Sequence, residues 1–159
     1  MSARGLIRAL KHLPGKHPQK SHAGGRGSSN ISISYYDPDG MDDVEGDPYE
    51  VAQEAGLYIS NDKEPTSIAL DGNEIVGAVF TSVDSDEFSF DIAVKPAYQG
   101  KKIGTKLLDA AMSESEEFGD VYPDMSIRVD AVNPVMAAML KKRGFSEVGK
   151  THSGVEMVL

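Results

Sequence analysis

The 159-residue sequence contains no cysteine, and this absence excludes several kinds of chemistry at once. Without thiols the chain has no disulfide framework, no thiolate metal site and no cysteine nucleophile. It also has no apolar run that approaches the length needed to cross a membrane. We therefore expect a soluble, cytoplasmic protein with no membrane partner. A chain of this length is large enough to bury a core as one domain.

Acidic residues are missing from the first 36 positions, although the whole chain carries a formal net charge of −9. The basic residues of this segment are Arg4, Arg8, Lys11, Lys16, Lys20 and Arg26. Gly, Ser, Pro and His are frequent through residue 29, which predicts a flexible basic tail over residues 1–29 and a folded acidic domain over residues 30–159. The negative total argues against general nucleic-acid binding by the whole protein.

Apolar periodicity and turn residues divide the domain into short elements. Strands are predicted over residues 31–36, 67–70, 75–83, 88–94, 126–131, 145–148 and 155–159. Helices are predicted over residues 49–58, 103–117 and 133–142, the last of which ends at Gly144. This order indicates an α+β fold built around one sheet. We interpret the acidic residues 37–47 as a solvated loop and residues 113–117 as a solvated helix end.

The most informative segment is the loop Gln99-Gly100-Lys101-Lys102-Ile103-Gly104, which joins a predicted strand to a predicted helix. Such a turn points free backbone N–H groups and the positive end of a helix dipole at one spot. That arrangement suits a di- or polyphosphate, and Lys101 and Lys102 would add positive charge. Glycine-rich turns before helices are common, so the loop alone is a weak signal.

Three local patterns follow one another along residues 69–159. They are Leu70-Asp71-Gly72-Asn73-Glu74-Ile75-Val76-Gly77, then Ile92-Ala93-Val94-Lys95-Pro96 with the loop above, and the helix pattern from Asn133 to Gly144-Phe145. In this order and spacing they resemble the hairpin, acetyl-CoA motif and later helix motif of the GCN5-related N-acetyltransferase (GNAT) superfamily. The resemblance implies a mixed, mostly antiparallel sheet with helices on both faces.

The resemblance also implies acetyl-CoA as co-substrate and assigns residues to it. In the family, N–H groups of the loop and helix start hold the pyrophosphate, which here corresponds to Gln99, Gly100, Lys101, Lys102, Ile103, Gly104 and Thr105. The pantetheine amides pair with a strand edge, as an added strand would, which here corresponds to Ile92, Ala93 and Val94. The edge is free in the family because the fourth and fifth strands splay apart, here residues 88–94 and 126–131. Asn133 matches an asparagine that commonly touches the cofactor.

Two positions depart from the family pattern. Lys102 stands where the usual loop has glycine, and it could add a charge-assisted phosphate contact. Leu140 stands where many members have the tyrosine that protonates the leaving thiolate. The usual general acid is therefore missing, although water could reprotonate a thiolate.

The acceptor implied by the resemblance is a primary amine of a small molecule or protein, and it must lose a proton before it attacks. A carboxylate can take that proton directly or through water. We predict that Asp91 is the base, with Glu87 and Asp130 as rivals. The alternative is that Asp91 is only a polar residue on a solvated strand face.

The rival hypothesis is that the chain is a non-catalytic module that binds CoA or a protein partner. The reason to consider it is Leu140, at the position of the usual acid. The tail has three interpretations: an organellar transit peptide, an arm that touches nucleic acid, or a segment like those of bacteriophage-encoded proteins, which we favour. His12, His17 and His22 recur in the tail, but their five-residue spacing does not stack on one helix face, so we predict no metal site.

Overall fold

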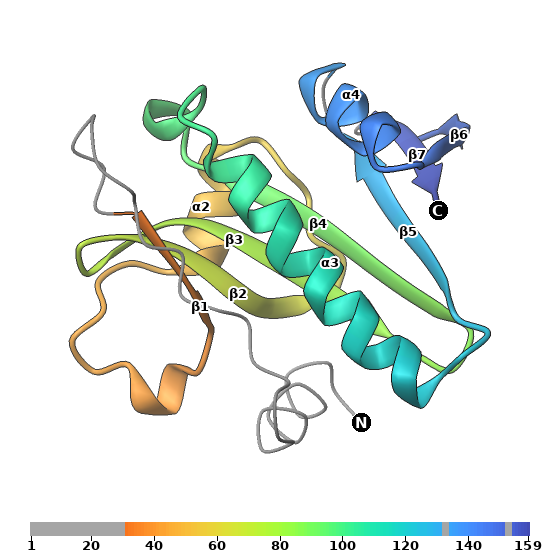
Figure 1. Cartoon of the computed structure of the whole chain (residues 1–159). Helices are drawn as coiled ribbons and strands as arrows, with labels where there is room; N and C mark the ends of the chain where they lie inside the picture. The colour runs from red at the N-terminus through yellow and green to blue at the C-terminus, as the bar shows by residue number, and fades with distance from the viewer. Residues whose placement is uncertain (1–30, 132–133, 152–153) are drawn as a thin grey trace.

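The computed structural model describes residues 31–131, 134–151 and 154–159, which form one sheet with flanking helices (Figure 1). The strands are β1 (Ile31–Tyr35), β2 (Glu64–Asp71), β3 (Glu74–Val83), β4 (Glu87–Val94), β5 (Ser126–Ala131), β6 (Ser146–Lys150) and β7 (Val155–Val158). They lie in the order β1-β2-β3-β4-β5-β7-β6. All neighbouring pairs are antiparallel except β4 and β5, which run parallel. The predicted mixed, mostly antiparallel sheet is confirmed.

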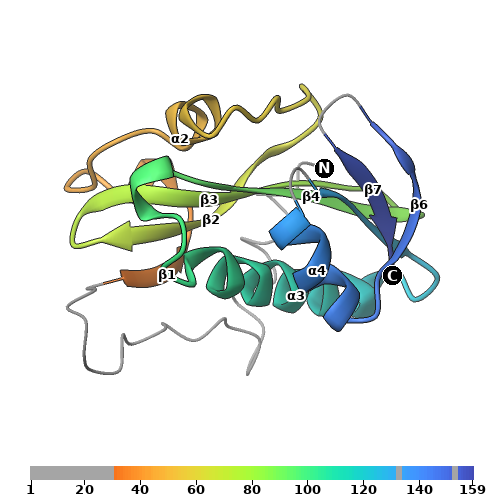
Figure 2. The same ribbon diagram turned by 90° about the horizontal axis from the view of Figure 1, so that it is seen from above.

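Helices cover both faces of this sheet, as predicted. Helix α2 (Pro48–Glu54) lies on one face, whereas α3 (Ile103–Val121) and α4 (Pro134–Lys142) lie on the other (Figure 2). Short 3-10 turns, η1 (Pro38–Gly40) and η2 (Pro96–Tyr98), complete the elements. One buried apolar cluster fills the space between the sheet and the α3–α4 side, and a second lies under α2. No helix in the described part of the chain is both long and apolar enough to span a membrane.

Helix α2 is shorter than the predicted 49–58, and its two ends show why. The Asp47 side chain caps the start by accepting a hydrogen bond from the Tyr49 N–H at 2.8 Å. After Ala55, Gly56 takes a left-handed backbone conformation with φ of 73°, and the Leu57 N–H donates to the Ala52 carbonyl at 2.9 Å. A glycine in this conformation closes a helix, so the chain turns away at residue 56.

Helix α3 is longer than predicted, and the acidic residues 113–117 are not a solvated helix end. That prediction is wrong, because Glu114 and Glu117 are 1% and 7% exposed and face the sheet. The helix continues to Val121, and Phe118 on its last turns packs against Phe88 of β4 with ring centroids 5.4 Å apart. The packing of Phe118 keeps the whole length of α3 on the sheet.

Hydroxyl groups of the sheet form hydrogen bonds with the buried carboxyl of Glu114. The hydroxyls of Ser67 and Thr66 on β2 lie 2.5 and 3.0 Å from its oxygens, and that of Thr81 on β3 lies 3.2 Å away. Burial raises the pKa of Glu114 to about 7, and the hydroxyl donors oppose this shift. Glu117 accepts a hydrogen bond from the Tyr35 hydroxyl at 3.3 Å. These contacts replace the water that a solvated helix end would have.

Candidate functional site

The two parallel strands at the centre of the sheet separate part-way along their length. β4 pairs with β5 from Glu87 opposite Ser126 to Phe90 opposite Val129, and the paired register ends there. From Asp91 to Val94, β4 remains paired with β3 on its other side, while Ala131 of β5 pairs with Val155 of β7. Figure 1 shows the strands diverging beyond this point. The unpaired edge of β4 therefore contains Ile92, Ala93 and Val94, the predicted pantetheine segment.

The loop between η2 and α3 leaves a series of backbone donors without acceptors. Among the described residues, none accepts a hydrogen bond from the N–H groups of residues 100–105. The first paired N–H of α3 is that of Lys106, which donates to the Lys102 carbonyl at 3.2 Å. With no acidic residue in the first turn of α3, the positive end of the helix dipole is uncompensated. The loop thus has the donors and charge that an anion requires.

Lys102, the departure from the usual glycine, lies in the left-handed region with φ of 65°. It is the N-terminal cap of α3, and its side chain makes no capping hydrogen bond. Only glycine adopts this conformation without steric cost, which explains why glycine is usual at this position. Lys102 carries that cost here, and its side chain is exposed.

Side chains of the loop fasten it to the end of the sheet. The Tyr98 hydroxyl donates to Asp71 Oδ2 at 2.7 Å, and this hydrogen bond raises the pKa of Tyr98 to about 12. The Lys101 ammonium lies 5.3 Å from the centre of the Tyr98 ring. Gln99, predicted to bind cofactor, turns its amide back to donate to the Val94 carbonyl at 3.2 Å. Sequence reasoning missed the Asp71–Tyr98 contact, because 27 residues separate the two partners.

The first turn of α3 lies beside α4. A methyl group added at Gly104 would come 3.8 Å from Met139 Cε, which is an ordinary contact, and Thr105 Oγ1 lies 3.3 Å from Met139 Sδ. The helix α4 begins at Pro134, and Asn133 lies outside the described residues. Leu140 of α4 is fully buried in the core, so the position of the usual acid is occupied by an apolar core residue.

Asp91 is buried on the α2 side of the sheet and forms an ion pair. It is 3% exposed, and its Oδ2 accepts a hydrogen bond from Lys63 Nζ at 2.9 Å. The alternative of a solvated strand face is therefore wrong, because Lys63 and the chain before β2 cover this position. Lys63 was missed, since a single lysine among the acidic residues before a strand carries no sequence signal.

The two oxygens of Asp91 have different surroundings. Whereas Oδ2 meets Lys63, Oδ1 is buried and has no hydrogen-bond partner among the described residues. Burial raises the pKa of Asp91, the Lys63 ammonium opposes that shift, and the carboxylates of Asp130 and Asp62 add to it. A carboxylate with a raised pKa is a stronger base than an exposed aspartate.

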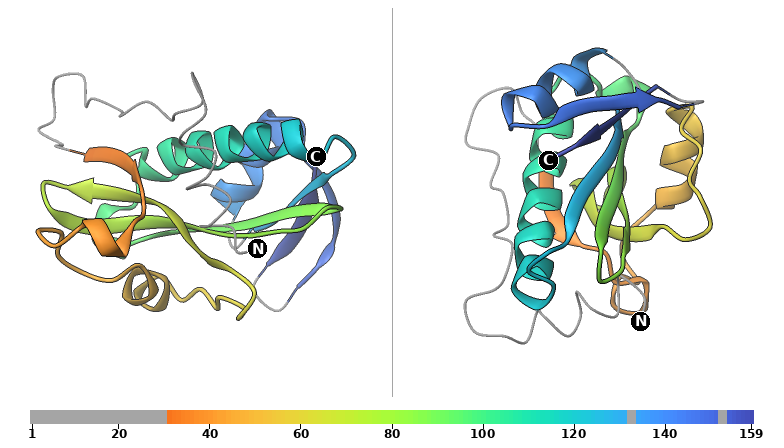
Figure 3. Two further views of the ribbon diagram at one scale, coloured as in Figure 1. Left: turned by 90° about the horizontal axis from the view of Figure 1, so that it is seen from below. Right: turned by 90° about the vertical axis from the view of Figure 1, so that its right-hand side faces the viewer.

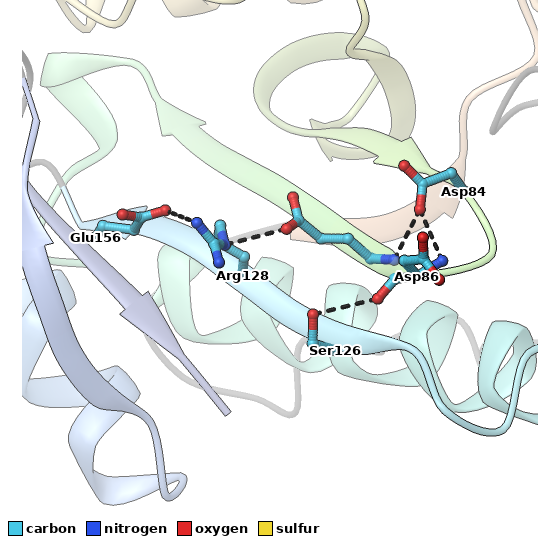
Figure 4. A network of polar contacts seen from close by, with 6 residues as sticks. Asp84, Asp86, Ser126, Arg128 and Glu156 are labelled. Carbon is cyan, nitrogen blue, oxygen red and sulfur yellow. Dashed lines mark hydrogen bonds and ion pairs between the residues drawn. The ribbon is translucent and has the colours of Figure 1, made fainter.

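The rival carboxylates are placed differently. Glu87 lies at the far end of β4, where β4 and β5 are still paired, and its Oε2 is 3.2 Å from Arg128 Nε. Arg128 of β5 also contacts Glu156 of β7, so that it links three neighbouring strands (Figure 4). Asp130 lies two residues beyond Arg128 on β5, close enough to Asp91 to affect its pKa. Asp91 and Asp130 directly follow the last paired residues, Phe90 and Val129, whereas Glu87 lies where the strands are still paired. Of the two at the parting point, Asp91 is the buried one.

Within the described residues, no group of three or more histidine or acidic side chains is arranged to hold a metal ion. The histidines that recur in the tail lie outside those residues.

One family model matches the chain. The sequence profile of the "Acetyltransferase (GNAT) domain" matches residues 62–147. A sequence comparison with curated proteins finds no significant match.

Solved structures show the same fold at low sequence identity. One is the ribosomal-protein-S18-alanine N-acetyltransferase of Escherichia coli, which is 20% identical with a TM-score of 0.59 over 81% of this chain and 92% of that one. A second is the PaiA N-acetyltransferase of Thermoplasma acidophilum in complex with coenzyme A, 18% identical with a TM-score of 0.56 over 80% and 97%. A third is a GNAT family acetyltransferase of Elizabethkingia anophelis with acetyl-CoA bound, 18% identical with a TM-score of 0.55 over 81% and 95%.

Proposed function

We propose that this chain, which belongs to the GNAT acetyltransferase family, transfers the acetyl group of acetyl-CoA to a primary amine. The observation that carries the proposal is the parting of β4 and β5 after Phe90 and Val129, beside a helix start whose N–H groups have no acceptor among the described residues. The fold neighbours crystallised with coenzyme A or acetyl-CoA support this choice of co-substrate.

The residues present fit the cofactor. The six N–H groups of residues 100–105 would hold the pyrophosphate, and the ammonium groups of Lys101 and Lys102 would add charge. The free edge of Ile92, Ala93 and Val94 would pair with the pantetheine amides. Gln99 contributes to the loop by holding the Val94 carbonyl, and Asn133 is proposed as a cofactor contact from the family resemblance alone.

In the proposed reaction, the amine nitrogen attacks the thioester carbonyl, a C–N bond forms and the C–S bond breaks. Asp91 takes the amine proton at Oδ1, while Lys63 holds Oδ2 and keeps the carboxyl ionised. Alignment of the two reactants supplies much of the rate in such a transfer. Because Leu140 offers no acid, the thiolate leaves unprotonated and water returns the proton.

Calorimetry with CoA tests the cofactor part of this proposal. Gly104→Asp should abolish binding, because it places a negative charge at the first turn of α3 against the pyrophosphate. An added Cβ at Gly104 meets only Met139 Cε, at 3.8 Å, so we expect the variant to fold and the loss of binding to be electrostatic. Gly119→Asp, on the same helix with no atom within 4 Å of an added methyl, is the matched control and should bind CoA normally. A wild-type protein that does not bind CoA, or a Gly104→Asp protein that binds it fully, would overturn the assignment.

A non-catalytic module that binds CoA or a partner is the second candidate, and the buried Leu140 favours it. Release of free CoA thiol in the presence of a panel of primary amines separates the two. Amine-dependent release supports the enzyme, whereas CoA binding without any release supports the module.

The domain boundary, the role of the tail and the location of the protein are proposed from the sequence alone. We place the domain boundary near residue 30 and assign the basic tail, residues 1–29, to an electrostatic contact with nucleic acid, an acidic partner or a particle surface. From its resemblance to segments of bacteriophage-encoded proteins, we propose that the protein acts in the bacterial cytoplasm during infection or is carried in a virion.

A further inference from the structure

On the face of the sheet against which α2 packs, the strands β4, β5 and β7 carry charged side chains, and we call this part the polar half. Side chains alternate along each strand, so Glu87 and Asp91 of β4 share this side with Arg128 and Asp130 of β5 and with Glu156 of β7. The pairings of Ser89 with Arg128 and of Asp130 with Glu156 fix that register. Helix α2 packs against β2, β3 and β4, and among the described elements no helix covers β5 and β7 on this side (Figures 2 and 3).

Negative charge exceeds positive charge on this polar half. Asp62, in the chain before β2, adds a further carboxylate. The Ser60 hydroxyl donates to it at 2.5 Å, and hydrogen bonds from Ser60 and Ser82 lower its pKa. Ser82 pairs with Ser89 of β4. Two cations face these carboxylates: Arg128 contacts Glu87 and Glu156, and Lys63 contacts Asp91. Five carboxylates therefore face two cations. Asp62 and Asp130 form no ion pair with either cation among the described residues, and both act on Asp91 electrostatically.

A second observation points to a ligand. The Asp91 side chain is only 5% exposed. Its Oδ1 is buried and has no hydrogen-bond donor among the described residues. A buried carboxylate oxygen without a donor is costly, so an N–H group from a bound molecule would be stabilising there. The carboxylates are not arranged as a metal site within the described residues, which favours an organic cation.

We infer that the acceptor is an amine that carries a second positive charge, with the reacting nitrogen at Asp91 Oδ1 and the second cation at the excess carboxylates of Asp62 and Asp130. This inference rests on the proposed function and narrows its substrate class. An uncharged tail would leave the excess carboxylates without a partner, and an anionic tail would be repelled by them.

Three amines with the same five-carbon chain test the inference: 1,5-diaminopentane, 1-aminopentane and 5-aminopentanoate. We expect kcat/KM to fall in that order, with the diamine preferred over the monoamine by about fivefold or more, the scale of one ion pair near the surface. The preference should weaken as salt rises, because exposed charges are screened.

Asp62→Asn should reduce the diamine preference at least threefold while the kcat for 1-aminopentane changes little, and Asp130→Asn should lower the preference in the same direction. Glu116→Gln, an exposed acid of α3 on the other side of the sheet, is the control and should keep the preference. Equal kcat/KM for the three amines, or a preference that survives both Asp variants, would overturn the inference and leave the proposed function standing. If none of the three is acetylated while other primary amines of the panel are, the inference fails and the proposed function stands. If no primary amine of the panel is acetylated by a protein that binds CoA, the proposed function fails and the inference falls with it.

Discussion

Asp91 combines burial, an ion pair to Lys63 and one oxygen without a donor among the described residues, which together explain how an aspartate can act as a base. Asp91→Asn keeps the shape but cannot accept the amine proton. We expect turnover to fall on the order of 10²-fold or more, with the KM for acetyl-CoA nearly unchanged, in steady-state measurements. Wild-type turnover in this variant would transfer the role to Glu87, Asp130 or water.

Lys63 sets the pH range over which Asp91 is ionised. Burial raises the pKa of Asp91, and the Lys63 charge opposes that shift. If Asp91 is the base, activity needs its carboxylate and should fall as pH drops through this pKa. Lys63→Met removes the opposing charge, raises the pKa further and should move the acidic limb of the kcat/KM profile to higher pH. Lys63→Arg keeps the charge and should keep the limb in place; an unmoved limb in Lys63→Met would show that Asp91 is not the titrating base.

Glu114 couples stability to pH. Its ordinary pKa of 4.5 is raised to about 7 in the folded protein, so between these values the folded state binds more protons than the unfolded state. The free energy of unfolding should therefore fall as pH rises from 4.5 to 7, by about 3 kcal/mol from this group. A proton on Glu114 also supplies the fourth hydrogen for the four contacts among Glu114, Ser67, Thr66 and Thr81.

Denaturant unfolding at pH 5 and pH 8 measures this effect. Glu114→Gln, which does not titrate, should lose most of the difference between the two pH values. Glu116→Gln, exposed on the same helix, should retain it. The assignment fails if Glu114→Gln and the wild type show the same pH dependence.

At the scale of elements, the approach of α3 to β3 depends on Gly77. A methyl group there would lie 2.8 Å from Leu107 Cδ1, 3.2 Å from the Ala93 carbonyl oxygen and 3.3 Å from Ala69 Cβ. Gly77→Ala should therefore destabilise the fold by about 1–3 kcal/mol, the usual cost of overpacking. It should also weaken CoA binding, because Leu107 lies one turn from the loop that precedes α3.

Chemical denaturation and calorimetry of the same protein check both effects. Adding Leu107→Ala removes the atom nearest to the new methyl group, so the double variant should show less overpacking cost than the sum of the single changes. Gly119→Ala is the control, since nothing lies within 4 Å of its added methyl and alanine favours a helix. A Gly77→Ala protein as stable as the wild type would show that α3 moves away at little cost.

For the whole molecule, the described core is built from residues after position 30. Residues 1–29 contain few apolar positions, and ordering a residue costs about 1–2 kcal/mol of backbone entropy. We expect deletion of residues 1–28 to leave the melting temperature and the affinity for CoA almost unaltered. Thermal melts and calorimetry on the truncated chain check this, and failure of that chain to fold would place the tail within the domain.

Local patterns made several features predictable from the sequence: the order of strands and helices, and the loop of the acetyl-CoA motif. Alternation marks a strand face, 3.6-residue spacing marks a helix face, and glycines such as Gly144 mark turns. The α+β class followed from the order of these elements, and the family resemblance added that the strands over residues 88–94 and 126–131 splay apart. Only the structure places the end of their pairing at residues 90 and 129. Helix lengths were less accurate, since Gly56 and the packing of Phe118 decide where α2 and α3 end.

Only the tertiary structure decided which charged residues are buried and with which partners. Lys63 reaches Asp91 across 28 positions, and Glu114 meets Ser67 across 47, so no local pattern carries either contact. An acidic residue in a helix or strand is usually solvated, and that rule led to the wrong prediction for residues 113–117 and to the alternative of a solvated face at Asp91. The fold overrides it where hydroxyls or an ammonium replace water, because a buried carboxyl is tolerated only with such partners.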